Sequence, residues 1–476
     1  MCGESSTRRR CWKFTRGCAA GRLSLQLKLM RLKMKRTIIV LFFFALALSL
    51  TYLNHGSSAQ GNTVAIKNAR IVTVTGPVIE KGAVIIQGDK IADVGASVRI
   101  PSGAKEIDAS GLTVYPGMIN ASTTMGLTEI GSVAATNDSS EIGEFNPQLK
   151  AIIAVHPESE IIPVTRVNGI TTVLTAPRGG ILAGQAALIN LDGWTWEEMN
   201  LKNPVGIVFN FPTIYSGRSF DFATFQVRER SFEEVKRQRD ETLDKVRKVF
   251  DDARAYAKAK EAKAKNPRLP DLETNLMLES LVPVVKGELP LLVNTSRERD
   301  IKAAVEFAAE QKVKIIIVGA DEAHKVASLL KEKNIPVILG PVFSLPLHED
   351  DPYDAQYTKA AALSKAGIKF AFQGVDGDGP GDASNARNLP YHAGMSVAYG
   401  LPKEEALKAL TIYPAEIFGV ADRVGSIEPG KLANLVITNG DLLEIRTQIR
   451  YLFIKGKQIA LKTKQTELYE KYVNRP

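Results

Sequence analysis

Cysteine is nearly absent from this chain of 476 residues. The three cysteines, Cys2, Cys11 and Cys18, all lie near the start, and their spacing is not that of a zinc motif. Because no cysteine follows them, the rest of the chain has no disulfide, no thiolate metal ligand and no cysteine nucleophile. A G-x-G-x-x-G run after a predicted strand is also missing, so the sequence does not predict a dinucleotide-binding fold.

The body of the chain lacks an excess of positive charge, although the whole chain has a formal net charge of +9. Residues 1–59 contain 11 lysines and arginines and a single acidic residue, Glu4. The remaining 50 basic and 51 acidic residues nearly balance. A nucleic-acid partner requires a basic surface, so we expect no nucleic acid to bind.

Residues 34–59 have the organisation of a signal peptide. A positive start at 34–36 precedes an apolar run of roughly 16 residues, and the Ser-Ser-Ala at 57–59 is typical of a cleavage site. The run is shorter than the about 20 residues of a spanning helix, so an N-terminal membrane anchor is the less favoured alternative. We expect an exported protein, periplasmic or extracellular, whose mature chain begins near Gln60. Residues 1–33 have no apolar pattern and are interpreted as a spurious or disordered extension.

The two ends of the body are rich in predicted strands, and its middle alternates strands with helices. Short alternating runs broken by Gly and Asp turns occur in 60–116 and in 424–476. Between them, β-branched runs such as 289–294 and 313–319 alternate with amphipathic helical stretches. The pattern predicts an α/β fold, in which 117–423 form a (β/α)8 TIM-like barrel and the two ends form one small β-sandwich.

One insertion in the predicted barrel is unusually charged. Residues 228–265 mix both signs of charge with alanine and contain few helix breakers, which predicts a long exposed helix or a helical hairpin. We expect a solvated helix, with an oligomer contact or a lid as the alternatives.

Four motifs, in the same order and spacing, resemble those of the amidohydrolase superfamily. VYPGMINASTT at 114–124 resembles the first barrel strand, whose pattern is PG-apolar-I-D-x-H-x-H, and GITTV at 169–173 resembles the second strand. LTIYPAE at 410–416, followed by Gly419, resembles the T-x-N-P-A-x-x-x-G helix. GSIEPGKLANLV at 425–436 resembles the return into the sandwich. The branch that these motifs most resemble is the imidazolonepropionase-like amidohydrolases.

This resemblance implies a metal-dependent hydrolase that cleaves non-peptide C–N bonds in cyclic amides or small peptide-like substrates. In the family, one or two divalent metal ions, commonly zinc, lower the pKa of a bound water, and a carboxylate on the last strand handles the proton. The family's ligands are an H-x-H pair on strand one, a histidine on each of strands five and six, and an aspartate on strand eight.

The four histidine positions of the family hold other residues in this chain. They are Ser122 and Thr124 on strand one, Asn294 on strand five (Ser296 if the register slips) and Gly319 on strand six. Neutral hydroxyl and amide oxygens do not replace imidazole in a tight zinc site. We therefore expect the usual metal centre to be absent or altered, and these positions to surround water or a small cavity.

The position of the eighth-strand aspartate falls in a segment rich in Asp and Gly. It is Val375 by strict spacing and Asp376 with a shift of one. The segment 374–382, which includes Asp378, is either a turn or a Ca²⁺ site made of oxygen ligands. Because this segment follows the eighth strand, we expect it to lie over the mouth of the barrel.

Further site candidates come from the loops that follow the predicted strands, because these loops face the active-site end of a barrel. The candidate catalytic residues are Asp376, Glu129, Glu144 and His348. The candidate substrate-binding residues are Ser122, Thr124, Asn294, Gly180 and Gln185. Each has a plainer alternative, namely a surface carboxylate, a tight turn or a structural histidine. A structural or surface role is favoured for all four histidines of the body, His156, His324, His348 and His392, among which His348 is the best site candidate.

Two functions remain open at this point. One is a hydrolase with an altered site, and the other is a non-catalytic exported binding or scaffold subunit derived from an amidohydrolase. Both predict a small-molecule substrate or ligand, and both allow a homo-oligomer or pairing with an active relative.

Overall fold

The computed structural model describes residues 63–214, 217–221, 226–374 and 382–475. The expected signal peptide, the three cysteines, Asp376 and Asp378 lie outside the described residues. The chain divides into two units, Met1–Gly61 and Asn62–Pro476, and only the second is described below. Within these described ranges, the search for a helix that is both long and apolar enough to cross a membrane finds none.

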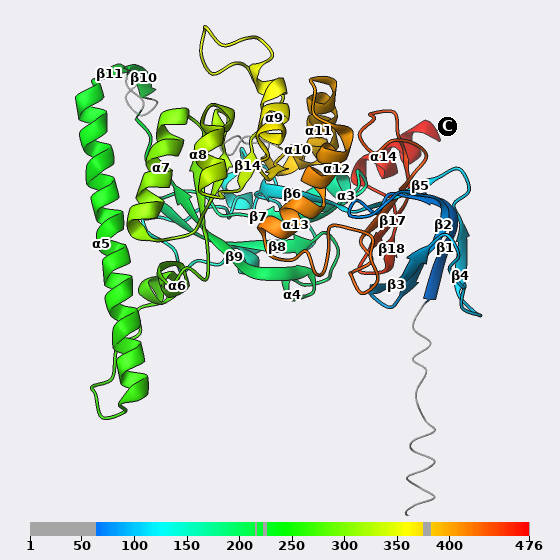
Figure 1. Ribbon diagram of the computed structural model, residues 1–476, viewed down its shortest axis with the longest axis horizontal. Coiled ribbons are helices and arrows are strands. Elements are labelled where there is room, and N and C mark those ends of the chain that lie inside the picture. Colours follow the sequence, from blue (N-terminus) through cyan, green and yellow to red (C-terminus); the bar gives the residue numbers. More distant parts are fainter. Residues whose placement is uncertain (1–62, 215–216, 222–225, 375–381, 476) are drawn as a thin grey trace, which may run out of the picture. The chain divides into compact units, whose positions relative to one another are not determined.

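A sheet of eight strands is built from both ends of the second unit (Figure 1). Its strands are β1 (Thr63–Ile71), β2 (Ile79–Gln87), β3 (Lys90–Gly95), β4 (Lys105–Asp108), β5 (Thr113–Pro116), β16 (Leu435–Thr438), β17 (Ile449–Ile454) and β18 (Lys457–Ile459). The two ends meet where β16 pairs antiparallel with β5, with Val436 opposite Tyr115. Seven of the strands pair in the order β18-β17-β16-β5-β1-β2-β3, and β4 pairs with β1 off this path. Their apolar side chains, such as Ile66, Ile86 and Phe453, form a core of their own.

A second sheet of eight strands forms the nearly closed barrel. Its strands are β6 (Met118–Thr123), β7 (Ile170–Thr175), β8 (Leu182–Asn190), β9 (Asn200–Asn210), β12 (Leu291–Thr295), β13 (Ile315–Gly319), β14 (Val337–Leu339) and β15 (Phe370–Phe372). They follow the order β15-β14-β13-β12-β9-β8-β7-β6. This confirms the predicted mixed α/β fold with a TIM-like barrel, and the two ends, predicted to form one small β-sandwich, together form a separate sheet.

Strand β8 departs from the all-parallel barrel that the sequence pattern predicts. It pairs antiparallel with both β7 and β9. The connection from β7 to β8 spans only residues 176–181, with Gly179 and Gly180 at positive φ. A parallel crossover needs about a dozen residues or more, whereas such a short loop returns the chain antiparallel.

Helices cover the outside of the barrel (Figure 1). They are α2 (Ala151–Ala154), α3 (Ile161–Arg166), α4 (Trp196–Met199), α5 (Phe232–Lys265), α6 (Leu276–Val285), α7 (Glu298–Gln311), α8 (Ala327–Glu332), α9 (Ala355–Ala366), α10 (Asp382–Asn385), α11 (Leu389–Ala398), α12 (Lys403–Leu410) and α13 (Ile412–Ile417). The helix α14 (Lys464–Val473) follows the end sheet, the hairpin β10 (Gly217–Asp221) and β11 (Gln226–Arg230) precedes α5, and 3-10 turns occur at Ala134–Thr136, Ala323–Val326 and Ala386–Asn388.

The charged insertion forms one helix, α5, of 34 residues and not a helical hairpin. Ser231 caps its N-terminus by accepting a hydrogen bond from the backbone N–H of Glu234. One stripe of α5 is buried, including Val246 and Phe250, and the Phe250 ring lies 6.1 Å from that of Phe307 on α7. The insertion is therefore packed on the barrel helices along one face and solvated on the other.

Alternation along the strands decides which side chains face the barrel interior. Val208 on β9 and Leu292 on β12 belong to the interior core, whereas their neighbours Phe209 and Val293 belong to the core beneath the helices. Successive side chains of a strand point to opposite faces, so the next inward positions are Asn210 and Asn294. Toward the carboxyl end of the barrel, the apolar layer of the interior is therefore followed by a layer of polar side chains.

Candidate functional site

A cavity of about 400 Å³ opens at the carboxyl end of the barrel, above the apolar interior layer. Its apolar floor includes Leu174, Val208, Leu292 and Val318. Its polar lining is Ser122, Arg178, Asn210, Thr213, Asn294, Thr295, Ser296, Arg297, Asp300 and Gln373. This volume is at the lower end of the range for small-molecule sites, and the carboxyl end is where barrel enzymes place theirs.

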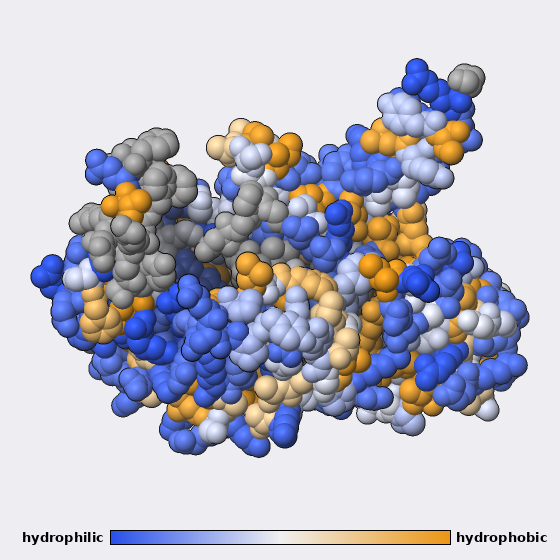
Figure 2. Space-filling view, turned by 90° about the horizontal axis from the view of Figure 1, so that it is seen from above, coloured by the Kyte–Doolittle hydropathy of each residue, from blue (hydrophilic) through white to orange (hydrophobic). Residues whose placement is uncertain are grey.

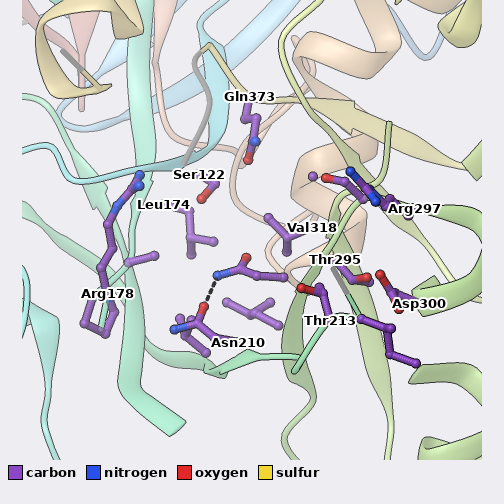
Figure 3. A pocket seen from close by; sticks show the side chains of 18 residues that line it. Ser122, Leu174, Arg178, Asn210, Thr213, Thr295, Arg297, Asp300, Val318 and Gln373 are labelled. Atoms are coloured by element: carbon purple, nitrogen blue, oxygen red, sulfur yellow. Dashed lines mark hydrogen bonds between the residues drawn. The ribbon is translucent and has the colours of Figure 1, made fainter. Parts of the chain in front are cut away.

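The structure brings together three of the four positions where the family resemblance places histidines. Ser122, Asn294 and Gly319 all line the cavity, and Ser122 and Gln373 project into it (Figure 3). Thr124 does not line the cavity. It lies two residues beyond Ser122 and is buried, and its backbone N–H donates to Oδ2 of Asp382 at 2.7 Å.

Gly319 has a backbone conformation that favours glycine. Its φ is +91°, and a β-carbon built on it would lie 2.8 Å from Oγ of Ser296. Its carbonyl accepts a hydrogen bond from the N–H of Gly340 at 2.6 Å. The end of β13 therefore contributes backbone to the cavity wall and has little room for a side chain.

Two asparagines on neighbouring strands form a hydrogen-bonded chain across the cavity floor. Nδ2 of Asn294 donates to Oδ1 of Asn210 at 2.6 Å, which is the dashed line in Figure 3. Nδ2 of Asn210 in turn donates to the carbonyl of Gly180 at 2.9 Å. Gly180 does not line the cavity. It lies in the short loop after β7, and its carbonyl fixes the position of the Asn210 side chain.

Arg178 and Asp382 form a buried ion pair at the mouth. Nη2 of Arg178 lies 2.5 Å from Oδ2 of Asp382, whose side chain is 4% exposed. Burial raises the pKa of Asp382, and Arg178 and the backbone N–H of Thr124 act against this rise. The pair fixes the guanidinium of Arg178, which lines the cavity, to the first residue of α10.

The opposite wall carries Thr295, Arg297 and Asp300, where β12 leads into α7. In Figure 3 Thr295, Thr213 and Asp300 lie together on one side of the cavity, across from Arg178. Asp300 is fully buried in the first turn of α7. This wall therefore carries both an arginine and a buried carboxylate, and the far wall carries an arginine that is paired with a carboxylate.

The candidate carboxylates Glu129 and Glu144 lie away from the cavity. Glu129 accepts hydrogen bonds from Oγ of Ser159 at 2.5 Å and from the N–H of Glu160 at 3.0 Å, so it supports the start of α3. Glu144 is exposed and pairs with Lys245 of α5 at 3.1 Å. Both follow the first strand, but the long loop between β6 and α2 carries them outward.

The candidate His348 also lies outside the cavity, in an exposed loop. Its Nε2 lies 3.0 Å from Oε1 of Glu322, and together with Asp351 they form a group of potential metal ligands. The ammonium of Lys325 already lies 2.7 Å from Glu322 and 3.4 Å from Asp351. This cation neutralises the carboxylates from within the fold, so the cluster is explained as a surface ion-pair network.

The remaining candidates have structural contacts. Gln185 is buried on β8, where its Nε2 donates to the carbonyl of Pro147 at 3.1 Å. His392 is buried in α11, and its Nδ1 accepts from the N–H of Val342 at 3.1 Å. Burial lowers the pKa of His392 to about 4, so it is neutral at physiological pH. Neither residue is part of the cavity lining.

Sequence reasoning missed Asn210, Arg297, Asp300 and the pairing of Arg178 with Asp382. Asn210 could have been found from strand alternation, since it follows inward-facing Val208 by two residues. Asp300 could not have been recognised as a cavity residue from the sequence, because acidic residues are common in the first turn of any helix. The partner of Arg178 lies 204 positions away in the sequence, beyond the reach of any local pattern.

Exposed apolar side chains also occur on loops of this molecule, including Ile142, Leu345 and Tyr353. In the view from above (Figure 2), the hydrophobic groups of the described residues are separated by hydrophilic ones. Isolated apolar side chains of this kind are normal on a protein surface. The cavity is therefore a better candidate for a binding site than these surface side chains.

Comparisons with known proteins agree with this architecture. Residues 315–459 match the model of the amidohydrolase family. The chain is 26% identical over 421 residues to an imidazolonepropionase of Porphyromonas gingivalis, which covers 81% of this chain and 87% of that protein. It is 24% identical over 394 residues to the amidohydrolase tasK of Hapsidospora irregularis, but spans only 37% of the length of tasK.

A solved structure extends the comparison to three dimensions. The crystal structure of an amidohydrolase from Thermotoga maritima superposes with a TM-score of 0.71 and 26% sequence identity, covering 83% of this chain and 99% of that one. The family match, the similarity to an imidazolonepropionase over most of both chains and the shared fold together support assignment to the amidohydrolase superfamily, in its imidazolonepropionase-like branch.

Proposed function

We propose that this amidohydrolase-family protein binds a small polar molecule of the amide or peptide-like kind in its barrel cavity, without a histidine-held zinc centre. The observation that carries the proposal is the set of groups at the ligand positions. Ser122 contributes a hydroxyl, Asn294 an amide, and Gly319 only backbone to the cavity wall.

These groups do not fit zinc. Structural and catalytic zinc sites are made of imidazole, thiolate and carboxylate ligands, and neutral oxygens do not offset the cost of desolvating the ion. The amide nitrogen of Asn294 is engaged with Asn210, and Gly319 has a φ of +91°, so a side chain there would be strained and would meet Oγ of Ser296. No histidine lines the cavity among the residues that the structure describes.

The same groups suit a small polar molecule. Hydroxyl and amide side chains on an apolar floor can donate and accept hydrogen bonds at fixed positions, which is how small-molecule sites orient a ligand. Ser122 and Gln373 enter from one side, and the Asn294–Asn210 pair lies along another. An amide group has an N–H donor and a carbonyl acceptor, so it can form hydrogen bonds with both kinds of group in this lining.

Hydrolysis of a C–N bond is the second candidate function, and the names of the relatives support it. One relative is an imidazolonepropionase and another an amidohydrolase. Turnover without zinc would need a carboxylate as general base. Asp376, the expected eighth-strand carboxylate, lies outside the described residues, and we propose it for this role.

Elemental analysis of protein expressed with added zinc tests the main proposal. We expect far less than one zinc per chain, and the same content in Ser122→Ala and Asn294→Ala variants. Stoichiometric zinc that disappears in either variant would overturn the proposal, because it would place the ion at these residues.

Turnover decides between the two functions. The purified protein is incubated with a panel of cyclic amides and dipeptides, and ring opening or cleavage is followed by mass spectrometry. Zinc-free turnover that Asp376→Asn abolishes would favour the hydrolase. Binding without any turnover would favour the binding subunit.

We also propose that the chain is exported and that its mature form begins near Gln60. The support is the order of charges, apolar run and small residues in 34–59. N-terminal sequencing of secreted or periplasmic material is expected to start within a few residues of Gln60. A cytoplasmic protein with an intact Met1 contradicts this.

A further inference from the structure

A second cavity lies at the opposite end of the barrel from the candidate site. It has a volume of about 620 Å³ and is formed where β9, β12 and β13 begin and where α7, α8 and α13 end. This volume is within the range of small-molecule sites. The two cavities share no lining residue. A ligand bound at this end would therefore be independent of the ligand in the barrel cavity.

Part of the lining of this second cavity is apolar and only partly buried. The residues concerned are Pro290, Ile335, Pro336 and Ile417. A smaller cavity of about 250 Å³ shares Ile335, Pro336 and Ile417 with it, so the apolar surface continues beyond the second cavity. Such a surface favours the apolar part of a ligand, because contact removes both from water.

Three lysines at the second cavity have no carboxylate partner. Lys202, Lys312 and Lys314 line it, and within the described ranges none of the three forms an ion pair. Of the two acidic residues in the lining, Glu416 is already paired with a lysine at 2.6 Å, which leaves Glu288. The cavity therefore has an excess of positive charge, although the body of the chain is nearly neutral.

Lys202 is the least exposed of these three cations. Its Nζ donates to the carbonyl of Phe418 at 2.7 Å, and this partner carries no charge. Burial lowers the pKa of Lys202, and the nearby Arg423 lowers it further. A partly buried ammonium without a counter-ion is stabilised by an anion that reaches it.

Lys312 has a backbone conformation that favours glycine. It follows α7 directly with a φ of 55°. Glycine is the usual residue at such a position, because a β-carbon is disfavoured there. A lysine at the end of a helix gains from the helix dipole, but this gain does not explain Lys202 on β9 or Lys314 directly before β13. Positive charge thus reaches the cavity from three different elements.

We propose that the second cavity binds an amphiphilic carboxylate, with the carboxylate held by Lys202, Lys312 and Lys314 and the apolar chain on the isoleucine and proline surface. A compact anion such as phosphate would leave this apolar surface in water. An uncharged apolar molecule would leave Lys202 without a counter-ion. Only a ligand with both parts uses both properties of the lining, and a cavity suits a small molecule better than an extended acidic peptide.

Isothermal titration calorimetry on the purified full chain tests the ligand class. The probe is decanoate, used below its micellar concentration. Propanoate keeps the charge and shortens the chain, and decyltrimethylammonium keeps the chain and reverses the charge. We expect decanoate to bind at a single site, and each control to bind about tenfold or more weakly.

Two variants link the binding to the lysines. Lys202→Met should weaken decanoate binding by about tenfold or more. Lys312→Gly should also weaken it, and its thermal midpoint should not fall below that of the parent protein, because glycine relieves the left-handed backbone. Lys455→Gly is the matched control, since Lys455 has a φ of 50° in the turn between β17 and β18, and it should leave the affinity unchanged.

Several outcomes would overturn the inference. Absence of decanoate binding would do so, as would equally tight binding of decyltrimethylammonium. Unchanged affinity in both Lys202→Met and Lys312→Gly would place the decanoate elsewhere, and loss of binding in Asn294→Ala would place it in the barrel cavity. Tighter binding of a polyglutamate peptide than of decanoate would identify an acidic peptide as the ligand instead.

Discussion

A β-carbon on Gly319 would lie 2.8 Å from Oγ of Ser296, at the edge of the cavity. Gly319 also has a φ of +91°, a conformation that L-amino acids with a side chain rarely adopt. The position at which the family resemblance places a histidine ligand is therefore occupied by backbone that disfavours any side chain. Restoring imidazole at Ser122 and Asn294 alone would leave the ligand set incomplete.

We expect Gly319→Ala to lower the free energy of unfolding by about 1–3 kcal/mol, from backbone strain and the contact with Ser296. Gly430→Ala is the matched control, because Gly430 has a φ of +89° with nothing within 4 Å of the added β-carbon. The control should lose only the backbone part, about 1 kcal/mol. Urea denaturation measures both, and equal losses would show that Ser296 does not restrict this position.

Arg178→Met should lower the free energy of unfolding by about 3 kcal/mol near pH 8, because it leaves Asp382 charged, buried and without its cation. Burial raises the pKa of Asp382, so its folded form gains a proton before its unfolded form as the pH falls. The penalty of the variant should therefore shrink toward pH 5. The double variant with Asp382→Asn should recover most of the loss, and failure to recover would argue against the pair.

The buried His392 should make the protein less stable in acid. Its pKa is lowered to about 4 from the ordinary 6.5, so the unfolded chain takes up a proton that the folded protein excludes. This stability is fully present above pH 6.5 and is lost as the pH falls toward 4, by about 3 kcal/mol. His392→Asn keeps an acceptor for the N–H of Val342 and should remove this part of the pH dependence. Unfolding curves that stay parallel between pH 7 and pH 4 would contradict the prediction.

Phe250→Ala on α5 should lower the free energy of unfolding by about 3–5 kcal/mol, since the ring is fully buried against Phe307. Lys258→Ala, on the exposed face of the same helix, should change it by less than about 0.5 kcal/mol. Thermal or urea unfolding followed by circular dichroism compares the two. If both variants change the free energy of unfolding by the same small amount, α5 does not depend on its buried face and behaves as the solvated helix that the sequence predicts.

The α/β class, the barrel and the family resemblance could all be predicted from the amino-acid sequence. These follow from local properties: the alternation of β-branched runs with amphipathic stretches, and four motifs of turn residues at fixed spacing. It also identified Ser122, Asn294 and Gly319 as positions of one site, because aligned strand ends of a barrel must converge.

The surroundings of these positions could not be predicted from the sequence. The antiparallel course of β8, the outward path of Glu129 and Glu144, and the ion pair of Arg178 with Asp382 depend on contacts between distant segments. The same holds for Asp300, whose sequence context is that of any acidic residue at a helix start. Its significance comes from burial, and burial is a property of the folded neighbours and not of the residue.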